Sequence, residues 1–90
     1  MIQPNALLTI TMKDNDLGQI LDALCVRRDA WRNTELYYHN GTCTEDMLIE
    51  DCDGEEEARF LADQYDSIIV ELQSQIKKAR LVNSISNEHK

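Results

Sequence analysis

Ninety residues are enough for one domain, and a chain of this length buries only a modest core. Seventeen acidic against nine basic residues give a net charge of −8, which argues against direct nucleic-acid binding, because contacts to phosphates need a basic face. No stretch approaches the ~20 apolar residues that a membrane-spanning helix needs, so we expect no membrane contact.

Residues 1–13 are expected to form an extended lead-in. Within 7–13, Leu8, Ile10 and Met12 alternate with threonines, which is the period of a short half-buried strand. A single strand has no partner in this chain, so we prefer a lead-in that covers the end of a helical pair. The other possibility is that a dimer pairs this segment with itself across a two-fold axis.

The first predicted helix spans residues 14–40. Its N-cap is expected to be Thr11, in a capping-box arrangement with Asp14, or Asp14 itself. Asn40 and Gly41 form a stop signal, because glycine takes the left-handed cap conformation without a steric penalty.

Residues 42–53 form a connector that is either irregular or holds one short helical turn. Its only apolar patch is Met47-Leu48-Ile49. The negative excess of the chain lies between positions 45 and 57, where there are eight acids and no base, whereas the rest of the chain has nine of each. The eight acids are Glu45, Asp46, Glu50, Asp51, Asp53, Glu55, Glu56 and Glu57.

The second predicted helix spans residues 54–82 and is followed by a flexible tail over 83–90. Asp53 and Glu56 are spaced as in a capping box. An apolar stripe then follows a 3-4 spacing through Leu61, Tyr65, Ile68 and Leu72, and Ala62, Ile69 and Ile76 widen it along one flank.

Charge favours an antiparallel pairing of the two helices. In that arrangement Arg28 and Arg32 lie near Asp63 and Asp66, and the acids at the start of the first helix lie near the bases at 77–80. Each exposed pair contributes at most about 1 kcal/mol, so the joint pattern carries the prediction.

The same pairing predicts an aromatic cluster near the acidic connector. Trp31 would lie beside Tyr65, with Tyr38 and Phe60 completing the cluster.

The apolar stripe is wider than one short helix, interrupted at Arg28 and Glu35, can cover. We therefore predict an all-α fold: an antiparallel two-helix hairpin with a short extended N-terminal segment, completing a four-helix bundle as a homodimer. The alternative is a monomer whose connector and N-terminal segment cover the stripe. The residues expected in the core and the dimer interface are Leu17, Leu24, Trp31, Leu61, Tyr65, Ile68, Ile69, Leu72 and Ile76.

No cofactor or metal is expected. A zinc site could draw on His39, Cys43, Cys52 and Cys25, but only the spacing of the first two suits paired ligands. An odd number of cysteines without a secretion signal favours free thiols in a reducing compartment, so we expect a cytoplasmic protein of a bacterium or of a phage-infected cell.

The chain is not expected to be an enzyme. A remote alternative is a Mg²⁺-dependent nucleotide pyrophosphohydrolase, whose class holds the metal with carboxylates from two facing helices. Here Glu55, Glu56, Glu57, Asp63 and Asp66 all lie on one helix.

The primary functional prediction is a non-enzymatic protein that acts through protein–protein contact, with itself as first partner. The alternative is an acidic mimic of nucleic acid, in which the carboxylates of 45–57 imitate phosphates and occupy the basic groove of a nucleic-acid-binding protein. In size and charge the chain resembles small phage proteins that block host defence nucleases, such as anti-CRISPR and anti-restriction proteins. This resemblance is one of character and implies no particular functional residue.

Overall fold

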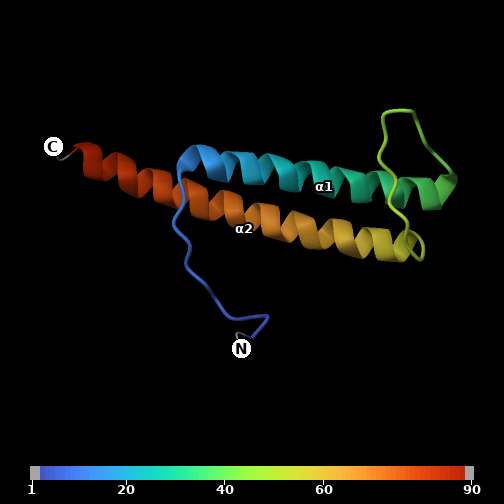
Figure 1. The fold of residues 1–90 in the computed structure, drawn as a ribbon, viewed down its shortest axis with the longest axis horizontal. Helices are drawn as coiled ribbons and strands as arrows, with labels where there is room; N and C mark the ends of the chain where they lie inside the picture. Colours follow the sequence, from blue (N-terminus) through green and yellow to red (C-terminus); the bar gives the residue numbers. More distant parts are fainter. Residues whose placement is uncertain (1–2, 89–90) are drawn as a thin grey trace.

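The computed structural model describes residues 3–88 and contains two helices, α1 (Asp14–Asn40) and α2 (Glu55–Glu88), with no strand in that range. The helices run antiparallel side by side and the connector joins them at one end (Figure 1). The Cα radius of gyration is 17.3 Å, against about 12 Å for a globular chain of this length. The predicted all-α hairpin is confirmed, and its shape is an elongated pair rather than a compact domain.

Helix α1 begins without a side-chain cap. Its N-cap is Lys13, and no cap hydrogen bond is made, so the predicted capping roles of Thr11 and Asp14 are wrong. The Asp14 carboxylate instead lies 2.8 Å from Arg80 Nη2 on α2. The predicted end is confirmed: Gly41 has φ 76°, and its N–H donates to the Tyr37 carbonyl over 2.7 Å.

Helix α2 begins one residue later than predicted and ends beyond the predicted limit of 82. Its first hydrogen bond runs from the Ala58 N–H to the Gly54 carbonyl (3.2 Å). Glu57, rather than Glu56, accepts the Asp53 N–H over 2.6 Å, so a carboxylate of the first turn does bond back to the backbone before the helix, but from a residue one position later than predicted. The chain stays helical to Glu88, because no glycine or proline follows Gly54 and each added residue gains a hydrogen bond. Residues 83–88 of the predicted flexible tail are therefore helical, and residues 89–90 lie outside the described part of the chain.

The core is a thin seam between the helices. Trp31 is 7% exposed and packs on Ala58 and Ala62, which are fully buried. Farther along α2, Ile69 and Ile76 continue the row at seven-residue spacing. The most buried row is thus the one that the sequence pattern had placed on the flank, because the bulk of Trp31 needs small residues opposite it.

Ion pairs line one side of the seam. Arg28 Nη1 lies 3.0 Å from Asp66, Arg32 Nη2 lies 2.7 Å from Asp63, and Arg59 Nε lies 2.8 Å from Glu35. These pairs confirm the antiparallel direction and the pairing predicted for Arg28 and Arg32. Arg28 and Glu35, which break the apolar pattern of α1, are the residues that the ion pairs use. We call this side the ion-pair face; it comprises Arg28, Arg32, Glu35, Arg59, Asp63 and Asp66.

Within the described residues, only the last part of the lead-in lies against the helical pair, where Met12 lines a hollow with Leu17, Ile76 and Ala79. The rest runs away from the hairpin near the C-terminal half of α2 (Figure 1), and Leu7, Leu8 and Ile10 are 96%, 65% and 75% exposed. The prediction of a covering segment is therefore wrong for residues 3–10 of a single chain. The physical reason is that α2 extends past the start of α1 and leaves no second apolar layer there for the segment to contact.

Candidate interaction surfaces

Thr34 holds the second half of the connector against α1. Its side chain is fully buried, its hydroxyl donates to the Ala30 carbonyl (2.7 Å), and its oxygen accepts the Glu50 N–H (2.8 Å). Glu50 also forms an ion pair with Arg27, and the Tyr38 hydroxyl donates to the Cys52 carbonyl over 3.2 Å. Residues 49–52 are therefore fixed to the hairpin. Sequence reasoning missed Thr34, because a threonine inside a helix does not reveal which segment will cover it.

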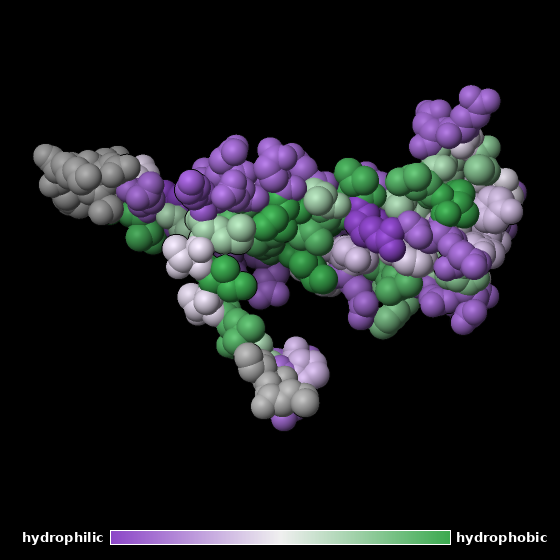
Figure 2. Space-filling model, viewed as in Figure 1, coloured by the Kyte–Doolittle hydropathy of each residue, from purple (hydrophilic) through white to green (hydrophobic). Residues whose placement is uncertain are grey.

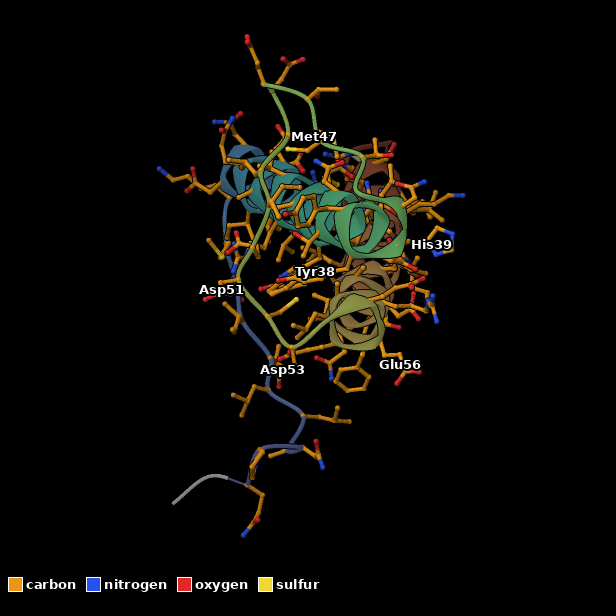
Figure 3. The ribbon with its side chains drawn as sticks, turned by 90° about the vertical axis from the view of Figure 1, so that its right-hand side faces the viewer. Tyr38, His39, Met47, Asp51, Asp53 and Glu56 are labelled. Atoms are coloured by element: carbon orange, nitrogen blue, oxygen red, sulfur yellow. The ribbon has the colours of Figure 1, made fainter. Side chains whose placement is uncertain are left out.

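The rest of the connector is irregular and projects away from the helices. A turn at Glu45 and Asp46 forms its tip, as Figure 3 shows above Met47. In the apolar patch Met47-Leu48-Ile49, Met47 and Ile49 are half-buried, whereas Leu48 is exposed. The alternative of a short helical turn is not what the structure adopts.

The eight acids of the 45–57 segment divide into two groups. Two of them form ion pairs with residues of the helices. Glu50 pairs with Arg27, and Glu55 pairs with Arg59 over 2.7 Å. Glu55 also lies 3.1 Å from His39 Nδ1. The remaining six are exposed and make no ion pair within the described residues. These six are Glu45, Asp46, Asp51, Asp53, Glu56 and Glu57. They spread from the tip of the connector to the start of α2 (Figure 3).

On the ion-pair face the carboxylates of Asp63, Asp66 and Glu35 form ion pairs with arginines. Hydrogen bonds from Arg28 and Arg32 lower the pKa of Asp66, and hydrogen bonds from Arg59 and then Arg32 lower the pKa of Glu35. Hydrogen bonds to Asp63 and then to Asp66 raise the pKa of the Arg32 guanidinium. These groups are charged and mutually satisfied at neutral pH, so this face offers few free charges to a partner.

The predicted aromatic cluster forms only in part. Trp31 and Tyr65 contact the same core cluster, and the Arg27 guanidinium lies 5.4 Å from the Trp31 ring centroid. Tyr38 instead stacks edge-on against Tyr37, with 5.4 Å between ring centroids, and Phe60 is 60% exposed. The prediction is wrong for Tyr38 and Phe60, because the connector with Cys52 occupies the place beside Trp31.

The other side of the seam carries apolar side chains without a cover. Ile68 is 49% exposed, Ile20 is 40% exposed and Val82 is 67% exposed, whereas Leu24 and Leu72 are half-buried. Helical geometry places Ile68, Leu72 and Val82 on the side of α2 away from the ion-pair face, and Ile20 and Leu24 lie along the α1 edge of the seam beside them. Figure 2 shows hydrophobic residues gathered along the middle of the hairpin, between the two helices. We call Ile20, Leu24, Ile68, Leu72 and Val82 the apolar face.

The predicted interface residues are brought together along one seam, at different depths. Leu17, Leu24, Leu61, Tyr65 and Leu72 are half-buried. Trp31, Ile69 and Ile76 are buried, and Ile68 is the most exposed of the set.

The cysteines do not form a candidate metal site. Cys25, Cys43 and Cys52 are free, and among residues 3–88 no group of three or more His, Cys, Asp or Glu could hold a metal ion. No helix in the described part of the chain is long and apolar enough to cross a membrane. No protein-family model, curated protein or solved structure matches the chain.

Proposed function

We propose that this chain is a non-enzymatic protein that acts by protein–protein contact, and that its first partner is a second copy of itself. The observation that carries the proposal is the apolar face. A surface on which Ile20, Ile68 and Val82 are 40%, 49% and 67% exposed, next to two half-buried leucines, is typical of an interaction site.

The exposed area supports the same proposal. The chain exposes 7416 Å², whereas a globular monomer of 10.4 kDa exposes about 5,400 Å². Part of the difference of about 2,000 Å² comes from the exposed N-terminal segment, and the rest includes the apolar face, on which a standard interface would bury ~800 Å² per partner. A second hairpin on the apolar face would supply the second layer that a two-helix chain lacks.

The test is the molar mass in solution, measured by sedimentation or light scattering at micromolar concentration. We expect a dimer for the natural chain. Ile68→Lys should weaken the dimer by about tenfold or more, because it buries a charge in the interface. Val70→Lys is the matched control: Val70 is 64% exposed on the same helix but points away from the apolar face, so its mass should stay dimeric. A natural chain that stays monomeric contradicts the proposal.

A second candidate function is mimicry of nucleic acid by the acidic segment, with a basic nucleic-acid-binding protein as partner. The observation that favours it is that six carboxylates are exposed and outside the ion pairs of the described residues. A line of unpaired carboxylates suits a groove that normally binds phosphates.

The structure sharpens the test of this second function. Within the described residues, the side chains of Glu45, Asp46, Asp51 and Glu56 make no ion pair with the hairpin, so we expect that changing them to Gln or Asn leaves the fold intact. Partners captured by the natural chain are then challenged with double-stranded DNA. Mimicry predicts that DNA displaces them and that the fourfold variant fails to capture them. Capture that persists under DNA contradicts mimicry.

A further inference from the structure

We infer that the two hairpins of the dimer pack apolar face against apolar face, with their acidic connectors at opposite ends of the four-helix bundle. This inference rests on the homodimer proposed above and adds the face, the occupant and the direction. The occupant of the apolar face is a second copy of this chain.

The choice of face follows from how the two sides of the seam are satisfied. On the ion-pair face, the carboxylates of Asp63, Asp66 and Glu35 already accept from arginines of the same chain. Covering that face would remove these charges from water without adding partners. On the apolar face a second copy buries side chains that carry no charge, such as Ile68 and Leu72.

The direction follows from the uneven charge along the hairpin. The connector end holds the eight acids of 45–57, of which, within residues 3–88, only Glu50 and Glu55 pair with arginines of the helices, Arg27 and Arg59. The opposite end holds Lys13, Lys77, Lys78 and Arg80 against Asp14, Asp16 and Glu88. Among the described residues that end is therefore positive by one charge, even though Arg80 and Asp14 pair with each other.

A two-fold axis can place like ends or unlike ends together. With like ends together, sixteen acids of two connectors would gather at one end of the bundle, where repulsion acts over the ~10 Å screening length of 0.1 M salt. With unlike ends together, each acidic connector lies beside the partner's basic end, and the charges are complementary. The second arrangement has the lower electrostatic energy for the same buried apolar area.

The two arrangements predict different distances between the Cys43 residues of the two copies. Cys43 is exposed in the connector, about 25 Å along the hairpin from the middle of the apolar face by the 1.5 Å rise per helical residue. Unlike ends together separate the two Cys43 residues by about 50 Å, whereas like ends together leave them about 20 Å apart, the width of a bundle.

Spin labels on Cys43, in a chain that carries Cys25→Ala and Cys52→Ala, measure this distance by pulsed electron resonance. A distance near 50 Å is the expected result. A dimeric mass with a distance near 20 Å overturns the inferred direction and leaves the proposed homodimer standing. A monomeric mass overturns the proposed function itself, so the two failures are distinguishable.

The face is tested separately by two label positions on α2, in the same background with Cys43→Ser added. Gln75→Cys lies at the edge of the apolar face and Gln73→Cys lies toward the ion-pair side, and both positions are exposed. We expect the label pair at 75 to be clearly closer than the pair at 73. The reverse order in a dimeric sample overturns the inferred face.

Discussion

Thr34 is the residue on which the position of the connector depends. It is the buried polar residue of the core, and it satisfies the Glu50 amide that would otherwise lie against α1 without a partner. Together with the Arg27–Glu50 pair and the Tyr38–Cys52 hydrogen bond, the Thr34 hydroxyl holds residues 49–52 on the hairpin, with Cys52 beside Trp31.

Thr34→Val should destabilise the hairpin by about 1–3 kcal/mol, because it keeps the shape of the side chain but leaves the Glu50 N–H unsatisfied. Denaturant unfolding measures the loss, and hydrogen exchange at the Glu50 amide should become faster. Thr34→Ser is the control, since it retains the oxygen. Unchanged exchange at Glu50 in Thr34→Val would show that the hydroxyl does not hold the connector.

Asp66 and Glu35 make the hairpin sensitive to acid. Their ordinary pKa values are 3.8 and 4.5, and arginine contacts lower both in the folded chain. The unfolded chain therefore binds more protons in acid, so the stability that these groups contribute is present above about pH 4.5 and is lost as the pH falls through the lowered values.

Asp66→Asn should reduce the stability by about 1 kcal/mol at neutral pH, because the side chain is 38% exposed and its two ion pairs are partly screened. It should also flatten the decline of stability between about pH 4.5 and pH 2. Thermal unfolding across this range is the measurement, with Asp22→Asn, an exposed position outside the ion pairs of the described residues, as the control. An equally steep acid decline in Asp66→Asn would contradict this role.

At the scale of the elements, α2 presents small residues where α1 presents its largest one. Ala58 and Ala62 are fully buried under Trp31, so the small residues of α2 make room for the largest side chain of α1. Farther along, Ile69 and Ile76 fill the seam opposite the smaller side chains of α1.

Ala62→Leu should overpack this contact and destabilise the hairpin by about 1–3 kcal/mol, even though leucine is a good helix former. Ala23→Leu on the exposed side of α1 is the matched control and should leave the stability within about 0.5 kcal/mol. Thermal or denaturant unfolding compares the two. Equal effects of the two substitutions would mean that Ala62 does not face a filled seam.

The N-terminal segment is separate from the hairpin energetically as well as in space. Leu7, Leu8 and Ile10 are exposed, and the backbone hydrogen bond within the described part of the segment, from the Ala6 N–H to the Gln3 carbonyl, is local. Deleting residues 1–10 should therefore leave the helix content by circular dichroism, and the unfolding midpoint of dilute protein, unchanged. A clear loss of helix would show that the segment contacts the hairpin in solution.

At the scale of the whole molecule, the hairpin has one layer less than a stable domain. Among the described residues the hairpin buries Trp31, three alanines and two isoleucines, and its other apolar side chains stay half-buried or exposed. Folding and association should therefore be coupled.

We expect the melting temperature to rise by about 5–10 °C over a hundredfold increase in protein concentration. Calorimetry or circular dichroism at several concentrations measures this. Ile68→Lys should abolish the dependence, whereas Val70→Lys should retain it. A melting temperature that is independent of concentration in the natural chain contradicts coupled folding and association.

The sequence by itself determined the class of fold, the limits of α1, the start of α2 within one residue and the antiparallel direction. These follow from local or periodic signals: Gly41 as a stop, apolar spacing, and the match of Arg28 and Arg32 with Asp63 and Asp66.

Only the tertiary structure decided how the two amphipathic helices meet. It turned α2 so that Ala62 and Ile69 face the partner helix and Ile68 stays half exposed, and it folded the connector onto Thr34. The physical reason is that rotation about a helix axis depends on the bulk of the facing residues, here Trp31, and that a buried hydroxyl gains its partner only when a distant segment reaches it. That rotation exposes the apolar face from which the proposed function is drawn.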